Sequence, residues 1–319
     1  NNVWRQAGLA VALGWKATTM STASNITHLA PRTADPATPA VRHLHFSDLI
    51  DSLRLGWEDF KAIPTHAIIL ALVYPVLGLV LARLAMGYSV LPLLFPMAAG
   101  FALLGPFAAL GLYELSRRRE RGEEPTASQA LDVLQSPSFG AMIALGAILM
   151  VLFGVWIACA QSIYVATFGY EPAASIPDFL GRIFSSDKGM TLIVAGCGVG
   201  FLFALVALCM SAVSFPYLLD RHATAPEAML ASLRVAAHNP IMMVTWGAIV
   251  AALLVLGTIP FFLGLTVVIP VLGHATWHLY RKALEPAANP YQPPPRQPHA
   301  PRYAAEFPSS LFSSWRRHN

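Results

Sequence analysis

Charge is scarce in this sequence. Only 12% of its 319 residues are Asp, Glu, Lys or Arg, which is about half the share that soluble domains carry. The charges are also unevenly placed, because the segments 65–115, 139–169, 189–217 and 240–279 contain Arg83 and Glu114 and no other charged residue. This distribution argues against a soluble enzyme.

Cysteines and catalytic motifs are few as well. Cys159, Cys197 and Cys209 lie in apolar segments and form no CxxC pair, so the sequence predicts no disulfide framework and no zinc or iron–sulfur site. It contains no GxSxG, Walker or HExxH motif. We therefore expect neither enzymatic activity nor a cofactor. The net charge of +4 comes from basic residues interleaved with acids, and so we expect no nucleic-acid partner.

The sequence does contain six apolar stretches, each long enough to cross a bilayer as a helix. They cover residues 66–86, 90–115, 140–168, 190–216, 241–257 and 261–280. A segment in hydrocarbon has to satisfy its own backbone hydrogen bonds, so these stretches are predicted helices. The predicted fold class is all-α, a polytopic transmembrane helical bundle with six spans arranged as three helical hairpins.

The basic residues predict the orientation of the spans. Ten Lys and Arg residues lie before the first span, in the second and fourth loops and just after the last span, whereas the opposite side has Arg182, Lys188 and Arg83. By the positive-inside rule, both termini are predicted to be cytoplasmic.

The two ends of the chain differ from its middle. Residues 1–45 form a predicted disordered lead-in rich in Thr, Ala and Pro, residues 46–285 a six-helix membrane domain, and residues 286–319 a proline-rich disordered cytoplasmic tail. The first methionine is Met20, which we expect to be the natural start.

A weak internal repeat organises the membrane domain. Short capped or amphipathic segments, 46–64, 126–137 and 224–240, precede the first, third and fifth spans. Residues 46–64 place six apolar side chains on one helical face, which predicts a helix at the membrane interface: Phe46, Leu49, Ile50, Leu53, Trp57 and Phe60.

Local signals support the other two copies. Thr126 with Gln129, and Thr224 with Glu227, have capping-box spacing. Each even-numbered span carries a proline that is expected to kink it: Pro106, Pro216 and Pro270. The sequence therefore predicts three copies of a unit composed of an interfacial helix, a span, a turn and a kinked span.

These features resemble a known family. The amphipathic lead, the Asn239–Pro240 pair that enters a span, and the final segment IPVLGHATWHLYRKAL (269–284) resemble a bacterial family of predicted integral membrane proteins of unknown function. The resemblance covers about residues 42–284 and implies six helices in the bacterial inner membrane. It implies no activity.

Members of that family are sometimes labelled as resembling subunit I of cytochrome c oxidase. Such a subunit needs six intramembrane histidines, but the spans here offer only His66, His274 and His278. The copper-site pattern HPEVY is absent. We therefore reject a catalytic oxidase function.

One candidate site remains. His274 and His278 are four residues apart on one helical face, a spacing that can offer two imidazoles to one metal. The predicted topology places His66 and Glu114 at the same cytoplasmic level, so His66, Glu114, His274 and His278 form a hypothetical polar or metal-binding cluster. The simpler alternatives are that His274 hydrogen-bonds to a neighbouring helix, and that Glu114 pairs with Arg117 or Arg118.

Three classes of function follow. The leading prediction is a non-catalytic inner-membrane protein that is an accessory or assembly component of a larger, respiratory-type membrane complex, with the lipid bilayer and other integral membrane proteins as its partners. The alternatives are a small transporter or channel, suggested by the repeat and the kinked spans, and a haem- or metal-binding protein that uses His274 and His278.

Overall fold

The computed structural model describes residues 39–63, 83, 93, 96–97, 105–170, 176–221, 223–260 and 263–286. The chain divides into two compact units, Asn1–Ala40 and Val41–Asn319, and the elements described here belong to the second. Within the described residues every regular element is helical, and Val41 and Leu284 form a single isolated β-bridge. The all-α prediction is confirmed for this part of the chain.

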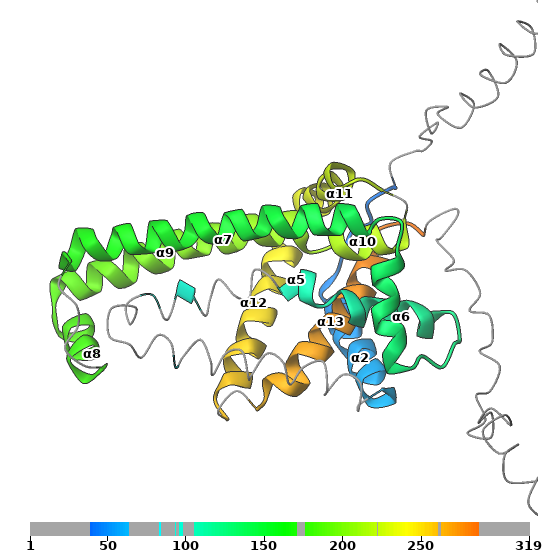
Figure 1. The fold of residues 1–319 in the computed structure, drawn as a ribbon, viewed down its shortest axis with the longest axis horizontal. Coiled ribbons are helices and arrows are strands. Elements are labelled where there is room, and N and C mark those ends of the chain that lie inside the picture. Colours follow the sequence, from blue (N-terminus) through cyan, green and yellow to red (C-terminus); the bar gives the residue numbers. More distant parts are fainter. Residues whose placement is uncertain are drawn as a thin grey trace, which may run out of the picture. The chain divides into compact units, whose positions relative to one another are not determined.

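Long apolar helices form one part of the described structure (Figure 1). They are α7 (Phe139–Phe168), α9 (Asp187–Ser211), which continues after a short break as α10 (Ser214–Asp220), and α12 (Pro240–Thr258). The three segments Phe139–Phe168, Asp187–Asp220 and Pro240–Thr258 are long and apolar enough to cross a membrane. They correspond to the predicted spans 140–168, 190–216 and 241–257, which are confirmed as candidate spans.

The other three predicted spans have a different standing. Residues 66–86 lie outside the described residues except for Arg83, and the segment 90–115 is described mainly from residue 105 on, as α5 (Gly105–Ala108) and the start of α6 (Leu110–Glu120). The segment 261–280 largely coincides with α13 (Leu265–Ala283), which is not among the three candidate spans. The number of six spans therefore stays a prediction.

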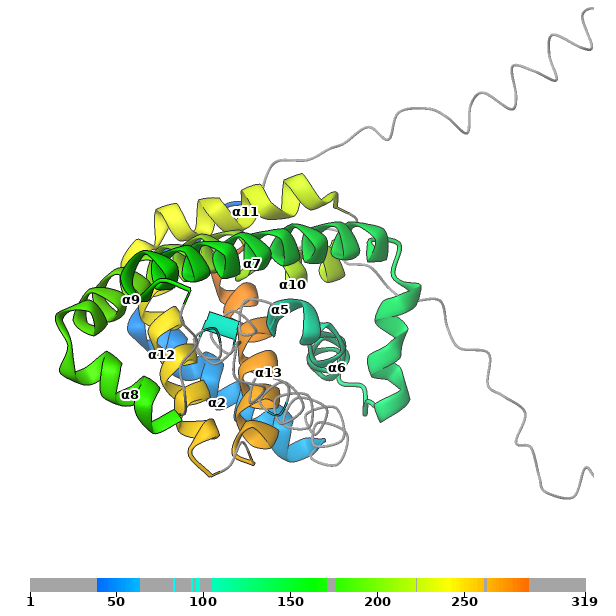
Figure 2. The same ribbon diagram turned by 60° about the vertical axis from the view of Figure 1, so that its left-hand side comes forward.

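Shorter elements accompany these helices (Figures 1 and 2). They are α2 (Phe46–Ala62), the 3-10 helix η4 (Ala127–Gln135), α8 (Ile176–Ser185) and α11 (Ala225–His238). Both predicted capping boxes are present, since Gln129 accepts a hydrogen bond from the Thr126 amide at 2.6 Å and Glu227 accepts one from the Thr224 amide at 2.7 Å.

Helix α8 was not predicted; it lies in the connection between the predicted spans 140–168 and 190–216. It is amphipathic, with Leu180 and Phe184 exposed on one side and Phe179 against Tyr164 of α7. Gly189 allows α8 to pack closely on the first turn of α9, since a Cβ atom at this position would lie 2.0 Å from the Ile183 carbonyl oxygen.

Two of the three prolines lie near helix breaks. The break between α9 and α10 is at Ala212–Val213, and Pro216 follows in the first turn of α10, where it has no amide hydrogen to continue the helical pattern. The break between α5 and α6 is at Ala109, one turn after Pro106. Helix α13 continues through Pro270 without interruption.

The packing of α2 differs from the interfacial helix predicted for 46–64. Its predicted apolar face is divided: Leu49 and Phe60 are buried within the protein, whereas Phe46, Ile50 and Trp57 stay exposed. The buried side of α2 also contains Ser52 and Gly56, and it packs against α13. Small residues on this side allow the two backbones to approach, as shown by an ideal Cβ atom on Gly56, which would lie 2.6 Å from the Ala275 nitrogen and 2.7 Å from the Val271 oxygen.

The substitution Gly56→Ala should therefore destabilise the protein strongly. A methyl group at this position meets backbone atoms that cannot rotate away, and overpacking of this kind costs about 1–3 kcal/mol. The measurement is the melting temperature of purified protein in detergent micelles. Gly154→Ala in α7 is the matched control, because its Cβ atom would meet nothing within 4 Å. Equal melting temperatures for the two variants would contradict the close packing of α2 on α13.

Candidate functional site

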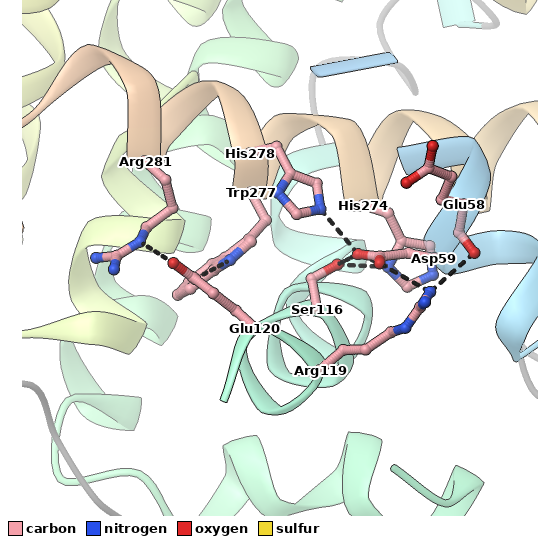
Figure 3. Close-up of polar contacts among 9 residues, drawn as sticks. All are labelled: Glu58, Asp59, Ser116, Arg119, Glu120, His274, Trp277, His278 and Arg281. Atoms are coloured by element: carbon pink, nitrogen blue, oxygen red, sulfur yellow. Dashed lines mark hydrogen bonds and ion pairs between the residues drawn. The ribbon is translucent and has the colours of Figure 1, made fainter. Parts of the chain in front are cut away.

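The candidate site is centred on Asp59, a residue of α2 that is only 6% exposed (Figure 3). Its carboxylate points away from the charged side of α2 and toward α13 and α6. One oxygen, Oδ2, accepts a hydrogen bond from the Ser116 hydroxyl of α6 at 2.6 Å and lies 2.9 Å from Nε2 of His278 on α13. Asp59 therefore connects three helices that are far apart in the sequence.

Ser116 links Asp59 to the second histidine of α13. Its oxygen lies 2.7 Å from Nδ1 of His274, whose side chain is completely buried. The hydroxyl has one proton, which goes to the ionised carboxylate of Asp59, so the oxygen is left to accept a hydrogen bond from His274. This assigns the proton of the neutral His274 ring to Nδ1, and it confirms the alternative that His274 bonds to a neighbouring helix.

Arg119 completes the surroundings of Asp59. Its Nη1 atom donates to Oδ1 of Asp59 at 3.1 Å and to the backbone oxygen of Glu58 at 2.8 Å. Burial by itself would raise the pKa of Asp59, but the hydrogen bonds from His278 and Ser116 and the positive charge that the histidines can carry hold this pKa below its ordinary value. Asp59 is thus an ionised carboxylate with partners on both oxygens. We call Asp59, Ser116, Arg119, His274 and His278 the Asp59 cluster.

The cluster offers little to a metal or haem in the arrangement described. His278 Nε2 faces Asp59 and His274 Nδ1 faces Ser116, so each imidazole already uses one nitrogen within the protein. The other nitrogen of His274 is buried and makes no well-formed hydrogen bond with the described residues. In the part of the chain that the structure describes, no group of three His, Cys, Asp or Glu side chains is arranged to hold a metal ion.

Glu114 belongs to a different set of contacts. Its carboxylate pairs with Arg117 and, at 2.7 Å, with Nε of Arg118, and all three side chains are buried. The predicted pairing of Glu114 with these arginines is therefore confirmed. Arg118 also binds Asp132 of η4 at 3.0 Å, which fastens that 3-10 helix to α6.

The structure thus brings His274 and His278 to the same carboxylate and places Glu114 in an arginine network instead. His66, the fourth residue predicted for the cluster, lies outside the described residues. Asp59, Ser116 and Arg119 were not predicted to belong to the site.

A second polar feature lies at the C-terminal ends of α6, α10 and α13. Arg117 of α6 donates to the Leu219 oxygen of α10 at 2.6 Å. Arg221, at the end of α10, lies 3.4 Å from the Tyr280 hydroxyl of α13 and also donates to the Glu285 carbonyl. Arg281 of α13 binds Glu120 of α6 at 2.9 Å. We call Arg117, Arg221 and Arg281 the arginine ring, because each reaches the next helix end in a closed cycle.

Acidic and aromatic partners complete the arginine ring. Asp220 is 2% exposed, accepts a hydrogen bond from the Tyr280 hydroxyl at 2.7 Å and lies 3.3 Å from Arg281. Glu120 accepts a hydrogen bond from the Trp277 indole at 3.0 Å, as Figure 3 shows. The buried charges of this feature, Arg117 and Asp220, therefore have partners, as charges in a protein interior need, whereas Glu120 and Arg281 are partly exposed.

A sequence signal for the arginine ring exists. The segments YELSR (113–117), YLLDR (217–221) and WHLYR (277–281) share the pattern aromatic–x–Leu–x–Arg. This pattern repeats at the cytoplasmic ends predicted for the second, fourth and sixth spans, so a search for local repeats there would have found the three arginines. For Asp59 the signal is weaker: it lies three residues after Gly56 and seven after Ser52, on the same side of α2 as these small residues.

The substitution Asp59→Ala should lower the stability of the protein by about 3–5 kcal/mol, since it leaves Arg119 and His278 without their shared buried anion. The measurement is again the melting temperature in detergent micelles. Asp51→Ala on the exposed side of α2 is the matched control, and its half-exposed ion pairs with Arg54 and Lys282 should contribute less than about 1 kcal/mol.

The pH dependence of the stability that Asp59 contributes tests whether its carboxyl group is ionised. A carboxyl group whose pKa is lower in the folded than in the unfolded state stabilises the fold above the unfolded value, about 4 for Asp, and loses this contribution as the pH falls through the folded value. The difference in melting temperature between the wild type and Asp59→Asn should therefore be full near pH 7 and should shrink below about pH 4. A difference that is the same at both pH values would show that Asp59 is not ionised.

Comparison with known proteins gives one match. Residues 93–220 match a family described as "Predicted integral membrane protein (DUF2189)". Neither a curated protein nor a solved structure shows significant similarity to the chain. The family resemblance expected from the sequence is therefore confirmed for this segment, which includes α6, α7, α9 and α10. Together with the three apolar helices, this match indicates an integral membrane protein, and the matched family is one of unknown function.

Proposed function

We propose that this protein is a non-catalytic, multi-pass protein of the bacterial inner membrane, and that it packs against a larger membrane assembly as an accessory or assembly component. The observation that carries the proposal is the exposure of α9. Of the 18 most apolar consecutive residues in the segment Asp187–Asp220, 6% are buried, against 22% for Phe139–Phe168 and 17% for Pro240–Thr258. Helix α9 packs along α7, but most of its side chains are exposed or only half-buried, so much of its surface is available to lipid or to other helices.

The residues on this surface favour contact with other helices. Gly196 and Gly198 of α9 and Gly154 of α7 face open space, with no atom within 4 Å of an ideal Cβ position. Small residues allow helix backbones to approach closely in a membrane, where packing rather than the hydrophobic effect drives association. Large side chains on the same helix, Val194 and Phe201, are 65% and 56% exposed and can pack around such a contact.

The use of the polar groups supports a non-catalytic role. Asp59 binds residues of α6 and α13, Arg117 binds α10, and Arg281 binds α6 and α10. Each of these groups fastens one helix to another; Asp59 and Arg117 are buried, and Arg281 is partly buried. Such groups are engaged in holding the fold and are poorly placed to meet a soluble substrate.

The distribution of basic residues supports an orientation with the arginine ring on the cytoplasmic side. The arginine-rich end of α6, Arg221 and the Arg281–Lys282 pair lie at the helix ends that form the arginine ring, and Arg182 and Lys188 lie around α8. Short cytoplasmic loops carry such an excess of Lys and Arg. This orientation places both termini in the cytoplasm.

Cysteine labelling tests this orientation. In a chain with Cys159, Cys197 and Cys209 replaced by Ser, single cysteines would be introduced by Glu124→Cys near the arginine ring and by Tyr170→Cys, at a residue that is 88% exposed near α8. In intact spheroplasts a membrane-impermeant maleimide should label position 170 and should reach position 124 only after the membrane is opened. Labelling of position 124 in intact spheroplasts would reverse the proposed orientation.

Site-specific photocrosslinking tests the proposed assembly. A photoreactive amino acid in place of Val194 or Phe201 should give a discrete adduct of higher mass with another integral membrane protein in native membranes. The matched control is the same amino acid in place of Leu131, an exposed residue of η4 outside the long helices. Adducts with lipid alone at positions 194 and 201, together with migration of the gently solubilised protein as a lone monomer, would contradict the accessory role.

A further inference from the structure

Helix α11 exposes an apolar row beside a basic row. Leu230 and Leu233 are 46% and 42% exposed, and Ile241, at the start of α12, is 73% exposed. Leu233 and Ala237 share one side of α11, and Ile241 follows them beyond the break at Asn239, at the start of α12. Arg234 and His238 directly follow Leu233 and Ala237 in the sequence and are also exposed, so they form a basic row beside the apolar one. Apolar and basic side chains therefore run next to each other along α11.

The segment before α2 adds two more basic residues to this row. Asn239, which is 5% exposed, accepts a hydrogen bond from the Leu44 amide at 2.8 Å and donates one to the Arg42 oxygen at 3.0 Å. This holds residues 42–44 across the end of α11. The ring of His43 packs on the ring of His238, with 4.1 Å between their centroids. The side chains of Arg42 and His43 are exposed at this position.

The arginines of this surface lack acidic partners. Among the described residues, no carboxylate forms an ion pair with Arg42 or Arg234, whereas Arg54 on the exposed side of α2 lies 3.6 Å from both Asp51 and Glu58. The acidic residue on the exposed side of α11 is Glu227, at the opposite end of the helix, where it caps the Thr224 amide. The surface thus has an uncompensated positive edge beside an exposed apolar row.

We propose that this surface binds an anionic phospholipid. It consists of Arg42, His43, Leu230, Leu233, Arg234 and His238, and we call it the α11 surface. The phosphate lies against the two guanidinium groups and the histidine pair, and the acyl chains follow the leucines and Ile241 onto α12. Three features select this ligand: the positive edge matches the phosphate, the apolar row matches the acyl chains, and α11 leads directly into a candidate membrane span.

The proposed orientation places the α11 surface at the cytoplasmic leaflet, and only this assignment of the leaflet rests on the proposed function. Lipid binding in micelles does not depend on orientation or on a protein partner. A failure of the lipid experiment therefore leaves the proposed function untouched, and a failure of the crosslinking experiment leaves the α11 surface untouched.

Native mass spectrometry of the full chain in mixed micelles provides the test. Dioleoylphosphatidylglycerol should bind more tightly than dioleoylphosphatidylcholine at the same mole fraction. The double substitution Arg42→Gln and Arg234→Gln should weaken phosphatidylglycerol binding by at least about tenfold and should leave phosphatidylcholine binding unchanged, because each cation near a phosphate contributes substantially to anionic-lipid affinity.

The matched control is the double substitution Arg54→Gln and Lys61→Gln, which removes the same charge from the exposed side of α2. It should leave phosphatidylglycerol binding within about twofold of the wild type if the local site, rather than the net charge, sets the affinity. Unchanged melting temperatures would show that both double variants fold. Equal binding of the two lipids, an equal loss in the control, or full displacement by glycerol 3-phosphate, which lacks acyl chains, would overturn the proposal.

Discussion

The structure depends on the pairing of buried charges at one end of the helices. Arg117 is 3% exposed, Asp220 is 2% exposed and Glu114 is completely buried, so none of them is solvated by water. Removing one member of such a pair leaves the other buried without compensation, which costs several kcal/mol. Arg117 also donates to the Leu219 carbonyl of α10, and Arg281 of α13 pairs with Asp220 of α10 and Glu120 of α6, so each of the three helix ends is held by the other two. The Asp59 cluster extends this constraint to α2, whose packing on α13 at Gly56 and whose ion pairs of Asp48 and Asp51 with Lys282 hold it in the same place.

This concentration of polar contacts has a consequence for the rest of the molecule. The candidate spans α7, α9 and α12 make few polar contacts with other elements among the described residues, such as the 2.9 Å hydrogen bond from the Trp156 indole to the Pro96 oxygen, and the elements that adjoin them are fixed at the polar end. Their surfaces can therefore be apolar and largely exposed, since few residues in the most apolar stretch of each segment are buried. The polar end therefore holds the elements of the fold together, whereas the apolar helices α7, α9 and α12 have surface available to lipid and to other helices.

The sequence predicted what depends on neighbours along the chain and missed what depends on the packing of distant segments. The spans 140–168, 190–216 and 241–257, the two capping boxes and the pairing of Glu114 with Arg117 and Arg118 all follow from spacings within one helix or turn. Asp59 could not be identified in this way, because its partners lie 57 and 219 residues away in the sequence. The two sides of α2 were misjudged for the same reason: hydrophobicity identified Phe46 and Trp57, but small residues determine which side packs on α13.

The contact between the two ends of the described chain connects these features. Arg42 donates its amide proton to the Ala283 oxygen at 2.9 Å, and Val41 pairs with Leu284, so the segment before α2 meets the end of α13. Asn239 holds the same segment from the other side, at the point where α11 gives way to α12. The backbone of residues 41–44 is therefore fixed by two elements that belong to the last predicted copy of the repeat. Helix α2 belongs to the first predicted copy of the repeat and packs on α13 of the last copy. The first and last copies are therefore in contact, and this contact places Arg42 and His43 on the α11 surface.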